Sequence, residues 1–168
     1  MIRGNEVLAI IHSNAYDEVI PELTNMRTMG SVPFGGRYRL IDFTLSNLVN
    51  AGISKVGVIT KSNYQSLMDH LGTGKPWDLS RKRSGMYLLP PFGFAETGTF
   101  DNRIESLKGN MHFISRSKED YVLIADCNVV MNFSIDELMK FHEDNGADIS
   151  VVCKLQEFTV YFVFAFLQ

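Results

Sequence analysis

Two adjacent glycines and two arginines lie close together before an expected helix, and they are the residues best suited to hold an anion. Gly35 and Gly36 are followed by Arg37 and Arg39. Adjacent glycines let a backbone approach a ligand closely, and guanidinium groups donate paired hydrogen bonds to phosphate oxygens. The chemistry indicated is phosphate binding. The same residues also suit a tight turn before a helix, in which Arg39 and Asp42 are solvated or paired with each other.

An aspartate at the end of a strand-like run is the second candidate for chemistry. Asp126 follows the apolar run from Tyr121 to Ala125. A carboxylate in such a place can hold Mg²⁺, which prefers oxygen ligands. An aspartate that ends a strand is also a common helix cap or turn residue. The sequence leaves both interpretations open.

Zinc binding and serine catalysis are not indicated. Cys127 and Cys153 are too few for a disulfide framework and share no ligand spacing with the four histidines, so we expect both thiols to be reduced. No G-x-S-x-G pattern, which would mark a nucleophilic serine, is present. A basic group formed by Lys75 and residues 81–83 suits either an anionic effector such as a sugar phosphate or a solvated loop.

Four short β-branched runs indicate the fold class. They extend over Val7 to Ile11, Lys55 to Thr60, Tyr121 to Ala125 and Asp148 to Lys154, and each resembles a strand buried on both faces. Segments with helical spacing lie between them. This alternation is typical of a mostly parallel sheet with crossover helices. We therefore expect an α/β fold that is similar to a Rossmann sheet.

Three helices with recognisable ends are expected between these runs. They extend from Ile41 to Ala51, from after Ser62 to Leu71, and from Ser134 to Gly146. A glycine ends each helix, where a left-handed residue is favoured. Ser62 with Gln65, and Ser134 with Glu137, have the spacing of a capping box.

Two stretches do not fit the alternation. Residues Gly72 to Phe100 are rich in glycine, proline, aromatic and basic residues, which predicts a long binding loop above the sheet. Residues Phe158 to Gln168 are almost wholly apolar but are shorter than the roughly 20 residues of a membrane span. Such a segment is prone to aggregation unless it pairs as a strand, and it suits a sheet edge or burial between chains.

Composition and charge limit the classes of partner. The chain has 168 residues, with 16 Lys and Arg against 19 Asp and Glu, and a net charge of -3. Its 45% hydrophobic content suits one core and excludes a disordered chain. The acidic balance argues against nucleic acid, and the apolar run Val7 to Ile11 is too short for a signal peptide. We expect a cytoplasmic protein with small-molecule or protein partners and no membrane partner.

The glycine and arginine stretch is part of a longer motif that resembles a known family. The run PFGGRYRLIDFTLSN is followed by NAGI, by SL and HL within residues 66–71, and by WDL at residues 77–79. Together these resemble the N-terminal domain of ADP-glucose pyrophosphorylase, the glucose-1-phosphate adenylyltransferase of glycogen and starch synthesis. The resemblance extends from about Val7 to Lys154. It implies a nucleotide-diphospho-sugar transferase fold, with ligands over the carboxyl ends of the strands.

The resemblance also implies a reaction and a set of ligands. The family converts ATP and glucose 1-phosphate to ADP-glucose and pyrophosphate, with Mg²⁺ as the cofactor. Asp126 stands where the family has its G-D-H motif, so the resemblance implies that Asp126 is the catalytic residue and the metal ligand. The implied nucleotide-binding or substrate-binding residues are Arg27, Gly35, Gly36, Arg37, Arg39, Gly98 and Thr99.

Departures from the family pattern indicate that catalysis is lost. Catalytic members follow the first strand with G-G-x-G-x-R-L, whose backbone N–H groups hold the nucleotide phosphates. Here Ile11 to Glu18 contain no glycine, and Asp17 and Glu18 would repel a triphosphate. The family's R-A-K-P-A motif also has Met29 in place of its lysine. The chain therefore keeps the scaffold residues but not the phosphate loop.

This combination resembles the GlgD-type subunit, a partner chain that raises the activity of the catalytic subunit in certain bacteria. The resemblance implies a modulatory subunit that lacks a cofactor and is part of an oligomer. This subunit would assemble with a catalytic subunit, with copies of itself, or with both. We expect a partial nucleotidyltransferase domain over residues 1–157 and an atypical apolar tail over residues 158–168. Two alternatives stay open: an active nucleotidyltransferase that uses Mg²⁺, and a module that binds ATP or a sugar phosphate without turnover.

Overall fold

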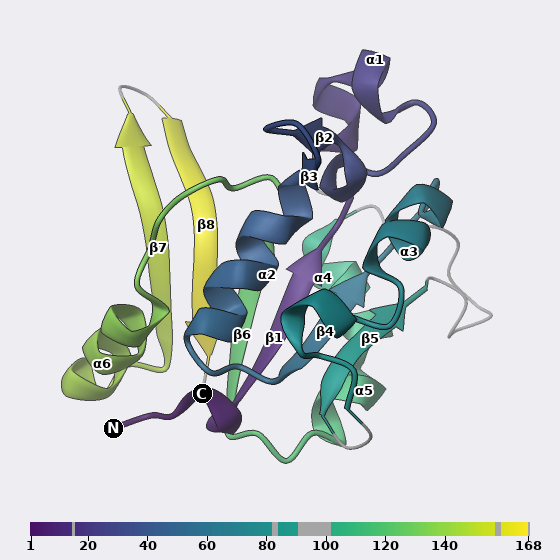
Figure 1. Cartoon of the computed structure of the whole chain (residues 1–168). Coiled ribbons are helices and arrows are strands. Elements are labelled where there is room, and N and C mark those ends of the chain that lie inside the picture. Colours follow the sequence, from purple (N-terminus) through teal and green to yellow (C-terminus); the bar gives the residue numbers. More distant parts are fainter. Residues whose placement is uncertain (15, 82–83, 91–101, 157–158, 168) are drawn as a thin grey trace.

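The protein is built on one six-stranded sheet with the order β5-β4-β1-β6-β8-β7 (Figure 1). The computed structural model describes residues 1–14, 16–81, 84–90, 102–156 and 159–167. Strands β5, β4, β1 and β6 are parallel, and β8 is antiparallel to both β6 and β7. The strands are β1 (Val7–His12), β4 (Lys55–Ile59), β5 (Gly85–Leu89), β6 (Tyr121–Asp126), β7 (Ile149–Gln156) and β8 (Thr159–Leu167). The expected α/β fold with a mostly parallel sheet is confirmed.

Helices cover both faces of this sheet (Figure 1). One face packs against α2 (Leu40–Asn50), α3 (Gln65–Leu71) and α6 (Ile135–Asn145), and the other packs against α4 (Arg103–Gly109) and α5 (Met111–Ser115). The short helix α1 (Pro21–Thr24) and the hairpin of β2 (Pro33–Phe34) and β3 (Tyr38–Arg39) lie between β1 and α2 in the chain. The remaining short helices are η1 (Gly4–Glu6), η2 (Asp17–Val19), η3 (Met29–Ser31) and η4 (Lys75–Trp77).

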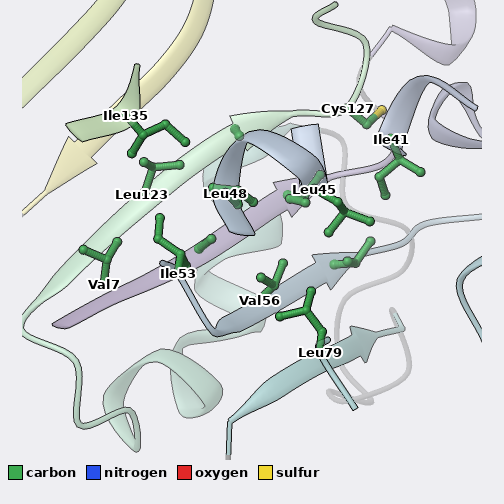
Figure 2. Close-up of a cluster of buried hydrophobic side chains, with 14 of the residues drawn as sticks. Val7, Ile41, Leu45, Leu48, Ile53, Val56, Leu79, Leu123, Cys127 and Ile135 are labelled. Carbon is green, nitrogen blue, oxygen red and sulfur yellow. The ribbon is translucent and has the colours of Figure 1, made fainter. Parts of the chain in front are cut away.

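The core is divided by the alternation of side chains along β1. Val7, Ala9 and Ile11 point to the face covered by α2, whereas Leu8 and Ile10 point to the face covered by α4 and α5. All five side chains have no solvent exposure, because β1 is central in the sheet. Figure 2 shows the larger cluster, in which α2 lies over β1 and β6. Burial of each large aliphatic side chain contributes about 1.5–3 kcal/mol, so this cluster holds the strand ends in place.

Most predicted element ends agree with the structure. Helix α2 is followed by Gly52 at a φ of 76°, and α6 is followed by Gly146 at a φ of 54°. Ser134 Oγ accepts a hydrogen bond from the Glu137 N–H at 3.2 Å, as its capping role requires.

Helix α3 begins after Ser62, as expected, but the expected capping box is wrong. The helix begins at Gln65 and its N-cap is Tyr64, so Ser62 does not cap it. Tertiary contacts hold the preceding loop in a different conformation: the Ser62 carbonyl accepts from Asn14 Nδ2 at 3.2 Å, and Asn63 has a left-handed φ of 52°. The capping-box spacing therefore identified a helix but not its first residue.

Two further expectations need correction. The stretch predicted as one long loop contains η4 and β5, and β5 pairs in parallel with β4. Residues 91–101 of that stretch lie outside the described residues. Strand β7 is not buried on both faces, because Ile149 and Val151 are 61% and 51% exposed. It is an edge strand of the sheet, and α6 packs on one of its faces, where His142 Nδ1 lies 2.8 Å from Ser150 Oγ.

The apolar tail is part of the main sheet. Residues Thr159–Leu167 form β8, which lies between β6 and β7 rather than at an edge. Pairing as a strand is one of the arrangements expected for this segment. Within the described part of the chain, no helix is long and apolar enough to cross a membrane.

Candidate functional site

A cavity of about 640 Å³ lies at the carboxyl ends of β1 and β4. The carboxyl ends of parallel strands meet at one edge of the sheet, which is where ligands bind in open α/β folds. The loop after β1, helix α1, the loop after β4 and the start of α4 form the walls. Its charged lining residues are Asp17, Glu18, Lys61 and Arg103.

Side chains close the loop that follows β1. Asn14 Nδ2 donates to Asp17 Oδ2 at 2.6 Å, and Asn14 Oδ1 accepts from the Lys61 N–H at 2.7 Å. The other oxygen of Asp17 accepts from the Met29 N–H at 2.7 Å. Burial raises the pKa of Asp17 above its ordinary value, although hydrogen bonds from Asn14 and Met29 oppose that rise. The loop is therefore held by its own polar groups and joined to the segments after β4 and α1.

Tyr16 adds an aromatic contact to this loop. Its backbone is left-handed, with a φ of 67°, which costs a non-glycine residue about 1–2 kcal/mol. The guanidinium carbon of Arg103 lies 5.1 Å from the centre of the Tyr16 ring. A contact of this kind attracts a cation to the ring face. Tyr16 thus joins the loop after β1 to the first residue of α4.

Asp126 ends β6 beside the end of β1, since His12 and Asp126 are partners in the parallel register. Its side chain has no solvent exposure, and its two oxygens accept from Arg103 Nε at 3.1 Å and Nη2 at 2.6 Å. Burial raises the pKa of Asp126, while the hydrogen bonds and the charge of Arg103 act against the rise. The Thr44 hydroxyl donates to the Asp126 carbonyl at 3.2 Å, which ties α2 to the same strand end.

His12 is a buried, neutral histidine at the end of β1. The Ser106 hydroxyl donates to the Arg103 carbonyl at 2.8 Å, so Ser106 Oγ accepts from His12 Nδ1 at 3.3 Å. His12 Nε2 is then the unprotonated nitrogen, and it is buried without a hydrogen-bond partner among the described residues. Burial, aided by the charge of Arg103, lowers the pKa of His12 to about 4.

The predicted phosphate-binding residues of the hairpin lie elsewhere. Gly35 and Gly36 form its turn, with φ values of 61° and 90°. The guanidinium carbon of Arg37 lies 5.8 Å from the centre of the Tyr38 ring, and Arg39 Nη1 donates to Ser66 Oγ at 2.8 Å. Among the described residues that line the cavity, none belongs to this hairpin.

The contacts of Asp42 test the alternative interpretation of the hairpin, in which Arg39 and Asp42 are solvated or paired with each other. Its Oδ2 accepts from the Arg39 N–H at 2.9 Å, so the pairing runs through the backbone at the start of α2. Its Oδ1 lies 2.6 Å from His70 Nε2. Arg27 is half-buried and also does not line the cavity, while Gly98 and Thr99 lie outside the described residues. The roles assigned to all these residues stay predictions.

The described residues do not fit a magnesium ion at Asp126. Both carboxylate oxygens are already hydrogen-bonded to one guanidinium group. Within the ranges that the structure describes, no group of three or more His, Cys, Asp or Glu side chains is placed to hold a metal ion. We therefore derive no reaction step through Mg²⁺ in this chain.

Sequence reasoning missed the roles of Arg103, Tyr16 and Asn14. Arg103 is 23 residues before Asp126, and no local pattern marks it as the partner of that aspartate. The loop after β1 differs from a phosphate loop by its lack of glycine, which did indicate altered chemistry. The sequence did not show that Asn14 and Asp17 bind each other and the backbone N–H groups of Lys61 and Met29.

Comparison with known proteins agrees with the fold and with the motif. The family model described as nucleotidyl transferase matches residues 20–159, which is most of the chain. The chain belongs to the nucleotidyl transferase family. Among solved structures, this family member is similar to a putative glucose-1-phosphate thymidylyltransferase from Bacillus anthracis. That comparison has a TM-score of 0.69 and 12% identity, over 96% of this chain and 71% of the other. It supports the fold alone.

Curated relatives of this nucleotidyl transferase family member carry two kinds of name. It is 38% identical to the glycogen biosynthesis protein GlgD of Bacillus subtilis over 89% of this chain, and 38% identical to GlgD of Geobacillus stearothermophilus over 89%. It is 36% identical to the glucose-1-phosphate adenylyltransferase of Pseudothermotoga lettingae over 88%. The matches cover 43%, 44% and 35% of those relatives, so the chain spans less than half of their length.

Proposed function

We propose that this chain belongs to a modulatory, non-catalytic subunit of an enzyme that makes ADP-glucose for glycogen synthesis. The observation that carries the proposal is the closed loop after β1, in which the Asp17 carboxyl group accepts from a backbone N–H and from Asn14. A phosphate loop needs backbone N–H groups that are free to donate to an anion. Here the N–H groups of Ser13, Asp17 and Val19 already donate to backbone carbonyls, and Asp17 holds the N–H of Met29 from the segment after α1. The names of the GlgD relatives support the same assignment.

Electrostatics at the cavity supports a loss of triphosphate binding. Asp17 and Glu18 line the same wall, where a nucleotide phosphate would have to approach. Two like charges 4 Å apart repel by about 4 kcal/mol at an effective dielectric constant of 20. Lys61 and Arg103 offset part of this repulsion, but Arg103 is paired with Asp126. Productive binding of ATP is therefore disfavoured at this loop.

A modulatory role requires a partner. We propose that the full protein assembles with a catalytic glucose-1-phosphate adenylyltransferase subunit in the cytoplasm, where glycogen is made, and raises its activity. The relatives with the adenylyltransferase name support a shared scaffold for such an assembly. Self-association is the alternative mode of assembly. The domain division at residue 157 remains part of this proposal.

A module that binds a nucleotide or sugar phosphate without turnover is the second candidate. It is favoured by the cavity itself, which has the volume of a small-molecule site and contains the cation of Lys61. It differs from the first proposal in one measurable property, because saturable binding would occur without any partner.

Calorimetry and an activity assay separate these functions. The chain is titrated with ATP in the presence of MgCl₂, and ADP-glucose formation is measured for the chain alone, for a catalytic subunit alone, and for their mixture. Stimulation of the catalytic subunit without ATP binding by the chain supports the modulatory proposal. ADP-glucose formation by the chain alone contradicts it. Saturable ATP binding without turnover or stimulation favours the binding module.

A matched pair of variants tests the closed loop. Asp17→Asn removes the negative charge that the loop holds, and Glu22→Gln removes an exposed charge of α1 that does not line the cavity. If the closed loop excludes ATP, only Asp17→Asn gains measurable ATP affinity. Equal gains in both variants would show that general surface charge, rather than this loop, excludes the nucleotide.

A further inference from the structure

The end of β6 holds a cation that is part of the chain itself. The Arg103 guanidinium group donates to both oxygens of Asp126, and the carboxyl group is fully buried beneath it. Paired, charge-assisted hydrogen bonds of this geometry fix both the position and the plane of the guanidinium group. Among the described residues, the carboxyl group is therefore held by the Arg103 side chain in one orientation, on the side where α4 begins.

Several contacts place Arg103 independently of Asp126. The Tyr16 ring lies against its guanidinium group, and its carbonyl accepts from the Ser106 hydroxyl. Asn102 precedes it as the cap of α4, with Asn102 Oδ1 accepting from the Glu105 N–H at 2.9 Å. The loop after β1 and the first turn of α4 thus hold the guanidinium group over the strand end. These contacts fix the guanidinium group in place, although 38% of the Arg103 side chain is exposed.

A divalent cation would compete with this guanidinium group for Asp126. Magnesium needs near-octahedral oxygen coordination at short distances, and the resemblance implies Asp126 as its ligand. Both oxygens of Asp126 are engaged, and the unpartnered nitrogen of His12 beside it carries a lone pair but no negative charge. A metal ion on the remaining lone pairs of Asp126 would lie next to the guanidinium group, and the two positive charges would repel each other.

We propose that Arg103 replaces the divalent metal ion as the cation at Asp126, so that this strand end is neutralised by the chain and binds no metal. Arg103 acts here as a positioning residue, because it holds β6, α4 and the loop after β1 together. This inference deepens the proposed modulatory function. It rests on that function only where it compares this chain with relatives that use a metal ion. It assigns no catalytic step to Arg103.

Manganese is the probe that tests this replacement, because Mn²⁺ broadens the NMR signals of nuclei close to it. The signal of the Arg103 Nε–H group is assigned in the wild-type chain by its loss in Arg103→Lys. Titration with Mn²⁺ is expected to leave this signal unbroadened relative to a distant arginine, Arg3. Selective broadening of the Arg103 signal that disappears in Asp126→Asn would overturn the proposal.

A second measurement uses the variant without the guanidinium group. Arg103→Met leaves Asp126 without its cation, and saturable Mn²⁺ binding, seen as an increase in the melting temperature or in water proton relaxation, is expected only in this variant. The double variant Arg103→Met/Asp126→Asn is expected to lose that response. Equal Mn²⁺ responses in the wild type and in Arg103→Met would contradict the proposal. If Arg103→Met does not fold, the wild-type NMR titration decides the question alone.

These measurements involve no catalytic subunit and no ATP. A wild-type chain that binds Mn²⁺ at Asp126 yet stimulates a partner would contradict the built-in cation and leave the modulatory function intact. A chain that excludes Mn²⁺ but fails to stimulate any partner would contradict the modulatory function and leave the built-in cation intact.

Discussion

Acid should destabilise this protein through His12. A histidine in an unfolded chain takes up a proton at its ordinary pKa of 6.5, whereas burial keeps folded His12 neutral down to about pH 4. Between these values the unfolded state binds the extra proton, so stability falls as the pH falls. Each pKa unit corresponds to about 1.4 kcal/mol, which gives a loss of about 3 kcal/mol between pH 7 and pH 4. This is a large part of the roughly 5–15 kcal/mol of a typical domain.

Other groups titrate in the same range, so the measurement must isolate His12. Asp17 and Asp126 have raised pKa values and therefore stabilise the folded state as the pH falls, which opposes the effect of His12. His142 has a lowered pKa and acts in the same direction as His12. All three are present in both the wild type and a His12→Gln variant. The difference between the two proteins contains the contribution of His12.

Urea unfolding of the two proteins across this pH range gives that difference. His12→Gln is expected to be less stable than the wild type at pH 7 and to approach or exceed it near pH 4, because glutamine has no proton to take up. His112→Gln, at an exposed position, is the control and should follow the wild type at every pH. A wild-type advantage over His12→Gln that stays constant with pH would refute the buried, neutral state of His12.

Three other changes follow from specific contacts. Arg103→Met should cost about 3–5 kcal/mol in urea unfolding because it leaves a buried carboxyl group unpaired, and adding Asp126→Asn should recover part of that loss. If Arg103→Met loses less unfolding free energy than a variant of an exposed arginine does, the pairing of Arg103 with the buried Asp126 carboxyl group is contradicted. Asp17→Ala should cost about 1–3 kcal/mol in the same measurement, since a backbone N–H loses its acceptor. Gly4→Ala should lower the melting temperature, because a Cβ would overlap the backbone of Ala51, and overpacking of this kind costs about 1–3 kcal/mol.

The parts of the fold that were predictable are those set by local pattern. The run Val7 to Ile11 reads as a strand because it is apolar throughout, and it is the central strand β1. Helix α6 was predictable at both ends because Ser134 and Gly146 act within their own turns. Strand β5 was missed because its residues, Gly85–Leu89, follow a stretch of glycine and basic residues. Its strand character comes from pairing with β4.

The site was predictable only in what it lacks. The missing glycines after β1 indicated a lost phosphate loop, but the sequence presented Asp17 as a repulsive surface charge. The structure shows it as the acceptor for Met29 and Asn14, an arrangement that depends on how the chain after α1 returns to β1. The pairing of Arg103 with Asp126 likewise needs α4 to lie against the end of β6. Contacts between distant segments carry no local signature, which is why composition and spacing could not reveal them.

Contacts of Asp17 and Arg103 occupy polar groups at two neighbouring strand ends. Strand ends in a parallel sheet concentrate backbone and side-chain polar groups, which in a transferase are satisfied when substrates and metal bind. In this chain Asp17 accepts from the Met29 N–H beside the loop after β1, and Arg103 donates to the carboxyl group of Asp126 at the end of β6. His12 Nε2 and Thr28 Oγ1 stay without a hydrogen-bond partner among the described residues, and a neutral polar atom costs far less to bury than a charge. A chain that supplies its own polar partners at these positions keeps the fold of its family, as the proposed modulatory function requires.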